Sequence, residues 1–167
     1  MALVATVGDA TSNSFVTLVE ANAYFVDRLH VTEWDDAENP EAALVLASHT
    51  LNWYVKWKGI RTTSTQSMQW PRMYCLRPDG SEVDSTIVPT EVKIATYELA
   101  LSFLADDRMA DNPLAGISSL KAGSLALQAS PGGVKSTDRD VIPEKVWKIL
   151  SELYSNGGMS VVRLVRG

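Results

Sequence analysis

Residues 90–106, TEVKIATYELALSFLAD, have an apolar pattern from which the architecture can be inferred. Placed on a helix at about 100° per residue, this stretch has two apolar faces. The first face carries Val92, Ala95, Thr96, Leu99 and Phe103, and the second carries Ile94, Tyr97, Leu101 and Leu104. The polar stripe of Glu91, Glu98 and Ser102 is narrow. Because such a helix must be covered nearly all round, we expect either the central helix of a bundle or a helix wedged against a neighbouring subunit.

Length and composition indicate one soluble globular domain. The chain has 167 residues, of which 46% are hydrophobic and 21% charged, as is typical of a domain with its own core. No apolar run approaches the roughly 20 residues that cross a bilayer, and the N-terminus lacks the features of a signal peptide. The single cysteine excludes an internal disulfide and favours a reducing, intracellular setting. Because Cys75 lies between Tyr74 and Leu76, we expect it to be a buried small hydrophobe rather than a reactive thiol.

The charge balance argues against nucleic-acid binding as the main role. The formal net charge is −5 and the isoelectric point is about 5.0. Non-specific nucleic-acid binding normally rests on clustered Lys and Arg. A local basic patch could still exist within an acidic average.

Capping patterns predict three further helices. Thr17 and Glu20 fit a capping box that opens the first. Asn39-Pro40 fits the start of the second, which we expect to end at Gly59. Pro143 opens the last helix, which is amphipathic.

The whole pattern predicts a mainly α fold, a bundle of four helices with a few short β-strands and an extended C-terminal tail. Loose alternation places the strands at residues 3–7 and 119–129. The expected parts of the single domain, 1–167, are a helical core at about 17–106 and 143–155 and a C-terminal arm at about 157–167.

Enzyme motifs are missing from the sequence. It contains no Walker loop, no dinucleotide-binding glycine pattern and no nucleophile elbow. We therefore expect a protein that is not an enzyme, with no catalytic residue, cofactor or metal. His49 is expected at the surface. A metal site of His30, Glu33, Asp35 and Asp36 can be imagined, but a solvated acidic loop fits better, because metal ligands usually lie on firm, well-supported elements.

Aromatic residues interleaved with basic ones have two interpretations. Such a pattern can stack single-stranded bases and hold phosphates. Alternatively, Trp53 and Trp57 are packing residues at helical spacing with solvated charges beside them, and this is the interpretation that we favour. The residues concerned are Trp53, Trp57, Trp70, Lys56, Lys58, Arg61 and Arg72.

The C-terminal residues also leave two alternatives open. Arg163 and Arg166 flank Leu164 and Val165 in an apolar stretch. This stretch is either a frayed terminus or an arm that pairs with the strand or surface of another chain.

At Gln69-Trp70-Pro71-Arg72 the chain resembles a family of tailed-phage and prophage proteins labelled DnaT-like single-stranded-DNA-binding proteins. Those proteins look like head-completion, or head-to-tail adaptor, subunits. The resemblance covers most of the chain, although Tyr74-Cys75 and residues 107–118 depart from the family pattern. The similar pieces are 13–16 with 20–25, Trp34, 42–44 with 47–48, Trp57 and Gly59, Gln66 to Arg72, Asp79-Gly80, Val88-Pro89, Val92 with Ala95 and 98–100, and 162–167.

The resemblance implies a connector-type structural subunit of a virion. Its expected form is a homo-oligomeric ring of twelve copies under the portal protein, which extends the DNA channel and offers a docking surface to the neck or tail-completion protein. DNA would pass through the channel without sequence-specific binding, and no membrane is involved. The subunit would be made in the host bacterial cytoplasm. Helices with more apolar surface than one contact would use fit a closed ring of subunits. An acidic lining of the channel repels the phosphates of the DNA that passes through it.

The resemblance also assigns residues. Gln66, Trp70, Pro71 and Arg72 are the structural motif: Trp70 and Pro71 are expected to fix the loop that feeds the central helix, and Arg72 to pair with an acidic residue of its own or the next subunit. The predicted portal or subunit interface consists of Trp147, Leu150, Tyr154, Arg163, Leu164, Val165 and Arg166.

The alternative function is a single-stranded-DNA-binding module used in replication. It requires Trp53 or Trp57 to be exposed and predicts oligonucleotide binding that weakens steeply with salt.

Overall fold

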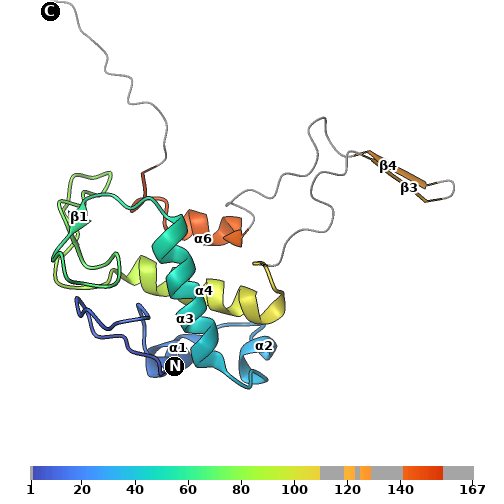
Figure 1. Cartoon of the computed structure of the whole chain (residues 1–167), viewed down its shortest axis with the longest axis horizontal. Coiled ribbons are helices and arrows are strands. Elements are labelled where there is room, and N and C mark those ends of the chain that lie inside the picture. The colour runs from blue at the N-terminus through green and yellow to red at the C-terminus, as the bar shows by residue number, and fades with distance from the viewer. Residues whose placement is uncertain (1, 110–118, 123–124, 129–140, 156–167) are drawn as a thin grey trace, which may run out of the picture.

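The structure is a computed structural model that describes residues 2–109, 119–122, 125–128 and 141–155. Figure 1 shows a mainly helical body, as the sequence predicts. The helices are α1 (Leu18–Val26), α2 (Thr32–Asp35), α3 (Pro40–Tyr54), α4 (Thr90–Ala105) and α6 (Glu144–Ile149). The strands are β1 (Ile60–Arg61), β2 (Arg72–Met73), β3 (Ser119–Ala122) and β4 (Leu125–Gln128).

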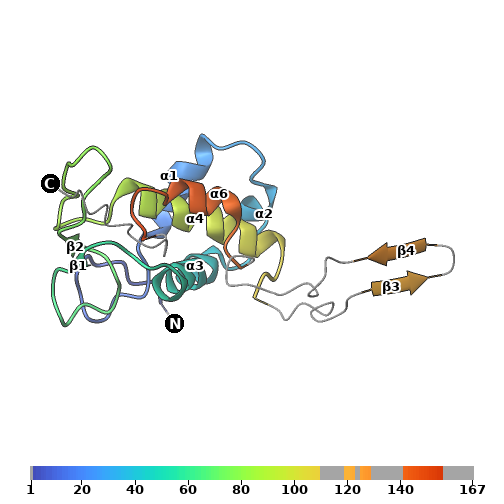
Figure 2. The same ribbon diagram turned by 90° about the horizontal axis from the view of Figure 1, so that it is seen from above.

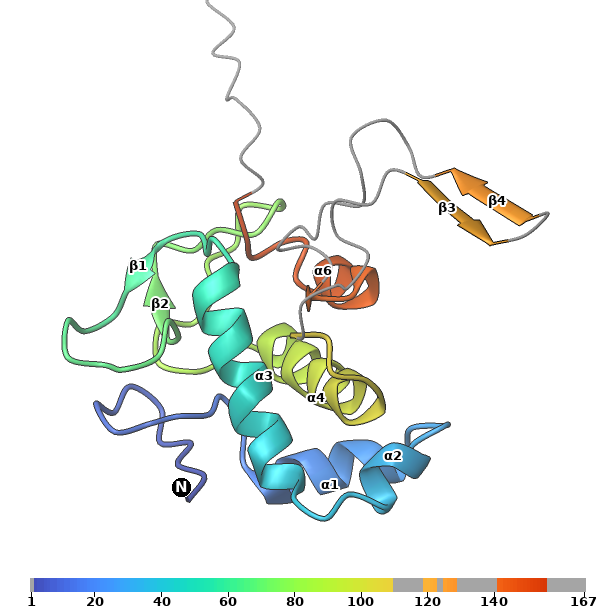
Figure 3. The ribbon, with the colours of Figure 1, turned by 45° about the vertical axis from the view of Figure 1, so that its right-hand side comes forward.

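Helix α4 is the centre of the body. Figures 1 and 3 show it between α6 on one side and α1 on the other, with α3 crossing it. It packs directly on α3, α6 and α2. Val92, Ala95 and Leu99 are completely buried, and Tyr97 and Leu101 on the opposite face are nearly so. Both apolar faces are thus covered by the same chain, which confirms the central-helix alternative and leaves no need for a neighbouring subunit here.

The predicted helix starts are confirmed by their hydrogen bonds. Thr17 and Glu20 form the complete capping box of α1, in which each satisfies a free N–H group of the other. The Asn39 side chain accepts from the Ala42 N–H, and Pro40 occupies the first position of α3. Helix α3 ends at Tyr54, however, five residues before the expected Gly59, because Val55 is already extended.

The strands differ from the prediction in number and place. Residues 119–129 contain the antiparallel pair β3–β4, with Leu120 opposite Leu127. Residues 3–7 form no strand, since the Val4 N–H bonds the Asn13 side chain instead. The additional pair β1–β2, with Ile60 opposite Met73, lies at one end of the helical body (Figure 2).

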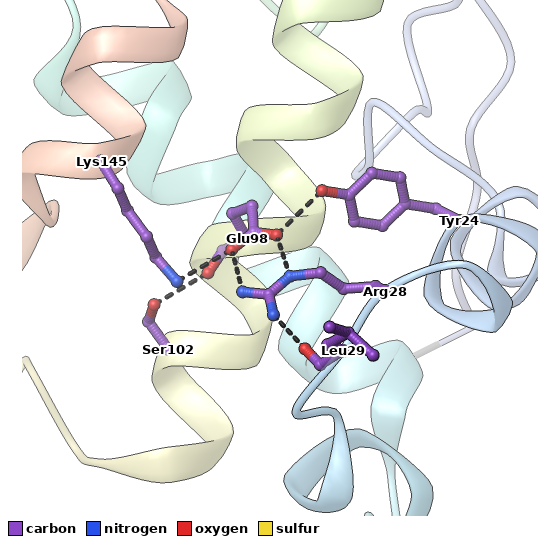
Figure 4. Close-up of polar contacts among 6 residues, drawn as sticks. All are labelled: Tyr24, Arg28, Leu29, Glu98, Ser102 and Lys145. Atoms are coloured by element: carbon purple, nitrogen blue, oxygen red, sulfur yellow. Dashed lines mark hydrogen bonds and ion pairs between the residues drawn. The ribbon is translucent and has the colours of Figure 1, made fainter.

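A buried ionic cluster joins α1, α4 and α6 (Figure 4). The Glu98 carboxylate accepts from the Tyr24 hydroxyl at 2.8 Å, from Arg28 Nε at 2.7 Å and from Lys145 Nζ at 2.9 Å. Its side chain is 7% exposed. The bonds from Arg28, with help from Lys145 and Tyr24, lower the pKa of Glu98 to about 2 despite its burial. The carboxylate therefore stays ionised and links the middle of α4 to α1 and α6.

Candidate nucleic-acid interface

The motif residues form a self-contained loop rather than a binding surface. Gln66 is 2% exposed, and its amide donates to the carbonyl oxygens of Met68 and Pro71. Trp70 is 1% exposed and meets Trp57 edge to face, with the ring centroids 5.5 Å apart. The Trp70–Pro71 peptide bond is cis. These contacts fix the loop between α3 and α4, as expected for Trp70 and Pro71.

Arg72 is buried and bonds to main-chain oxygens, not to an acidic partner. Its Nε donates to the Lys58 carbonyl at 2.7 Å and its Nη2 to the Gly59 carbonyl at 2.6 Å, while its Nη1 donates to the Gln69 side chain at 2.7 Å. Burial lowers the pKa of Arg72. Among the described residues no acidic side chain pairs with Arg72, so the predicted partner within the chain is not found there: the guanidinium satisfies the carbonyls where the chain turns from α3 into β1.

The predicted interface residues of the last helix split between core and surface. Leu150 is completely buried in its own chain, whereas Trp147 and Tyr154 are half-buried with their ring centroids 5.1 Å apart. A partner could reach Trp147 and Tyr154, but Leu150 belongs to the core. Arg163, Leu164, Val165 and Arg166 lie outside the described residues.

The other features considered from the sequence are the single cysteine, a metal site and a membrane-spanning helix. Cys75 is completely buried, and burial raises the pKa of its thiol, as expected of a packing residue. The part of the chain that the structure describes holds no group of three or more His, Cys, Asp or Glu side chains suited to a metal ion. In that same part, no helix has the length and apolar character to cross a membrane.

Residues 42–78, named here the acid-free segment, have a charge pattern opposite to the rest of the chain. They contain five of the 15 Lys and Arg residues and none of the 20 Asp and Glu residues. The basic residues are Lys56, Lys58, Arg61, Arg72 and Arg77. The segment covers nearly all of α3, both strands β1 and β2, and the loop that joins them. The segment thus carries only positive charges within a chain of net charge −5, and positive charge is what a surface for polyanions needs.

The two large aromatic residues exposed in the described structure both lie in this segment. Trp53 is 65% exposed and Tyr74 is 70% exposed. Trp53 lies in the last turn of α3, and the ring of His49, one turn earlier, lies 5.1 Å away at 31° to it. An indole held against a second ring and open to solvent on the outer face of a helix is a ready platform for a flat, aromatic ligand.

Two basic side chains of the acid-free segment are exposed and available to an anion. Lys56 and Arg61 are exposed, and neither forms an ion pair with another described residue. Arg61 donates only to the main-chain oxygen of Gln66. Lys58 Nζ donates to the Glu152 carbonyl, so it is partly engaged.

The Tyr74 end of the segment is less suited to an anion. Arg77 is paired with Glu91 at 2.6 Å and with Glu152 at 3.0 Å. The Tyr74 main-chain N–H donates to Glu82. Acidic residues from outside the segment therefore neutralise this end, and the Trp53 end is the better interface.

Comparison with known proteins fits this interface. The sequence model of the family described as "Putative DnaT-like ssDNA binding protein" matches residues 1–167. The chain belongs to this family. No curated protein and no solved structure matches it. The family part of the predicted resemblance is thereby confirmed, whereas the virion-adaptor part has no support from the comparison.

Sequence reasoning grouped Trp53 and Trp57 as packing residues, and the structure separates them. Trp57 is 8% exposed, against 65% for Trp53. The acid-free stretch is the signal that could have distinguished this surface, because it is visible in the sequence without any structure.

Proposed function

We propose that this DnaT-like protein binds single-stranded DNA at the acid-free segment, with Trp53 as the base-stacking residue. The observation that supports it most is the exposed indole of Trp53 in a segment that has no acidic residue and carries the exposed cations Lys56 and Arg61. Proteins that bind single strands without sequence preference combine these two features: aromatic faces for the bases and positive charge for the backbone.

The chemistry assigns a role to each side chain. A base stacks on Trp53, which His49 supports from behind, and every base has a π-face, so the stacking is tolerant of sequence. Lys56 and Arg61 contact the neighbouring phosphates, with Lys58 as a third cation once it leaves the Glu152 carbonyl. The acidic remainder of the chain repels further phosphates and limits the affinity.

A fluorescence-anisotropy titration of labelled oligothymidylate tests this proposal. Three phosphate contacts predict a slope of log affinity against log salt of about −2. Trp53→Ala should weaken binding by about 1–3 kcal/mol, the usual contribution of one stacked base. Lys56→Gln should reduce the salt slope by about 0.7, one contact's share.

Two control variants at exposed positions outside the acid-free segment separate the roles of Trp53 and Lys56 from general effects of truncation or charge removal. Val26→Ala matches the apolar truncation, and Lys148→Gln matches the charge removal, because both side chains are well exposed. Neither should change the affinity at low salt by more than about twofold. Equal losses in test and control variants, or no binding at low salt, would refute the proposal.

A second candidate is the structural virion protein, a head-to-tail adaptor or head-completion subunit. One observation favours it: α1 and the residue stretch after it expose Val19, Val26 and Leu29, at 78, 82 and 77%, as subunit contacts would require. We propose for this case the homo-oligomeric ring of twelve copies in the virion neck, between the portal and the tail-completion protein, with Trp147, Tyr154 and the C-terminal residues as the portal contact. Neither candidate involves catalysis.

Native mass spectrometry and negative-stain images of concentrated protein separate the two candidates. Closed rings of about a dozen copies that bind oligothymidylate only weakly would favour the adaptor. A small species with tight, salt-sensitive binding lost in Trp53→Ala would favour the single-stranded-DNA-binding function.

A further inference from the structure

The outer face of α1 is apolar although it lies in solvent. Val19, Ala23 and Val26 follow one another at helical spacing, and all three are exposed. Leu29, just beyond the helix, is 77% exposed. Solvent-facing positions of a helix are normally polar, so this row indicates a surface that is covered by a partner.

A cavity extends this row towards α2. It has a volume of about 340 Å³, and its lining is mixed: four apolar side chains (Phe25, Val26, Val31 and Trp34) and three polar ones (Asn22, Arg28 and Asp35). Val26 therefore belongs to both the exposed row and the cavity. Because they share Val26, the row and the cavity are treated together as one surface, named here the α1–α2 face.

The α2 end of the α1–α2 face is acidic: Asp35 lines the cavity, and the stretch that contains it, residues 27–38, is named here the acidic rim. Residues 27–38 contain five acidic residues, Asp27, Glu33, Asp35, Asp36 and Glu38, all exposed. None of the five forms an ion pair with another described residue. The single arginine of the stretch, Arg28, is committed to Glu98 at 2.7 Å. The surface thus fits an apolar segment that carries positive charge.

The chain contains a segment of that chemistry. Residues 159–167, MSVVRLVRG, contain five apolar residues and two arginines, with no acidic residue. Apolar side chains can enter the cavity while Arg163 and Arg166 meet the acidic rim, which gives the complementary charges typical of specific interfaces.

We propose that residues 159–167 of one copy dock on the α1–α2 face of a second copy. Such a contact joins two different surfaces, so it is heterologous and builds a ring or an open filament. The proposal does not depend on DNA binding, because the acid-free segment takes no part in it.

A charge-swap experiment on the full-length chain tests the contact. One variant is Arg163→Glu with Arg166→Glu, and the other is Asp35→Lys with Asp36→Lys. The two variants reverse the charges on the two halves of the proposed contact, and Asp35 and Asp36 are exposed, so their replacement does not disturb the core. Self-association is measured by sedimentation equilibrium, with Lys148→Glu as a control for charge on α6.

The wild type is expected to self-associate, and more weakly as salt rises. Each swapped variant alone should associate at least about tenfold more weakly, whereas an equimolar mixture should regain association, because one variant's acidic tail meets the other's basic rim. A wild type that is monomeric at all concentrations overturns the proposal, including the case in which the tail occupies the face of its own copy. Variants that associate as well as the wild type, or a mixture that regains nothing, also overturn it.

Discussion

Replacing Glu98 by glutamine tests how the helical body is held together. The Glu98 carboxylate receives charged hydrogen bonds from Arg28 on the α1 side and Lys145 on α6 (Figure 4). Glutamine has nearly the same shape, but its amide group carries no charge and directs two N–H groups at cationic donors. The variant therefore removes the ionic contacts without leaving a cavity.

The pKa of Glu98 indicates how much free energy of unfolding the substitution should remove. Its lowering from 4.5 to about 2 corresponds to about 3 kcal/mol at about 1.4 kcal/mol per unit. The side chains of Arg28 and Lys145 are 29 and 46% exposed, so solvent screens part of this energy. We expect Glu98→Gln to lower the free energy of unfolding by about 2 kcal/mol near neutral pH.

The pH dependence has a definite sign. Because the folded pKa of Glu98 lies below the unfolded value, the stabilisation is complete above about pH 5 and is lost as the pH falls towards about 2. Urea unfolding, monitored by far-ultraviolet circular dichroism, measures the free energy of unfolding of the wild type and of Glu98→Gln. At about pH 3 the difference between wild type and Glu98→Gln should shrink to below about 1 kcal/mol.

A surface ion pair supplies the control. Glu144 pairs with Lys148 at 3.1 Å, but their side chains are 82 and 75% exposed, so Glu144→Gln should change the free energy of unfolding by less than about 0.5 kcal/mol. If Glu98→Gln matches this control near neutral pH, or if its deficit is the same at about pH 3, the cluster does not stabilise the fold as argued.

Three further substitutions test the packing around the acid-free segment, each by urea unfolding. Trp57→Ala should lower the free energy of unfolding by about 3–5 kcal/mol, because the ring is buried against Trp70. Trp53→Ala should lower it by less than about 1 kcal/mol. Equal losses would contradict the conclusion that Trp57 is buried and Trp53 exposed. Gly59→Ala should lower the free energy of unfolding by more than about 1 kcal/mol, since Gly59 has φ +68° and a Cβ there would lie 2.4 Å from the main-chain oxygen of Met73. An unchanged urea midpoint would refute this prediction. Arg72→Lys should cost about 2 kcal/mol through the lost guanidinium bonds to carbonyls, yet leave the oligothymidylate affinity of the folded protein unchanged, and a loss of affinity would place Arg72 at the DNA.

The helices were predictable because their signals are local. Helical periodicity identified α4, and the side chains of Thr17 and Asn39 mark their helix starts by bonding within three residues. Local signals did not predict the end of α3 correctly. Helical spacing continues to Trp57, but the chain leaves the helix at Val55 because β1 must reach β2.

The parts that sequence reasoning missed depend on residues far apart in the chain. Glu98 falls on the narrow polar stripe of α4, and only the approach of Tyr24 and Lys145 makes it a buried ionised group. Arg72 would suit a phosphate by residue type, but the Lys58 and Gly59 carbonyls use its donors. The early end of α3 also separates the two indoles, because Trp53 lies on the helix and is exposed whereas Trp57 lies beyond it and is buried.

Ultraviolet cross-linking of the wild-type protein to oligothymidylate, followed by mass spectrometry of the peptides, tests the central claim most directly. Our account predicts that the cross-links concentrate in residues 42–78, with Trp53 as the main site and a steep loss of yield as salt rises. Cross-links concentrated outside residues 42–78, or none at low salt, would contradict it.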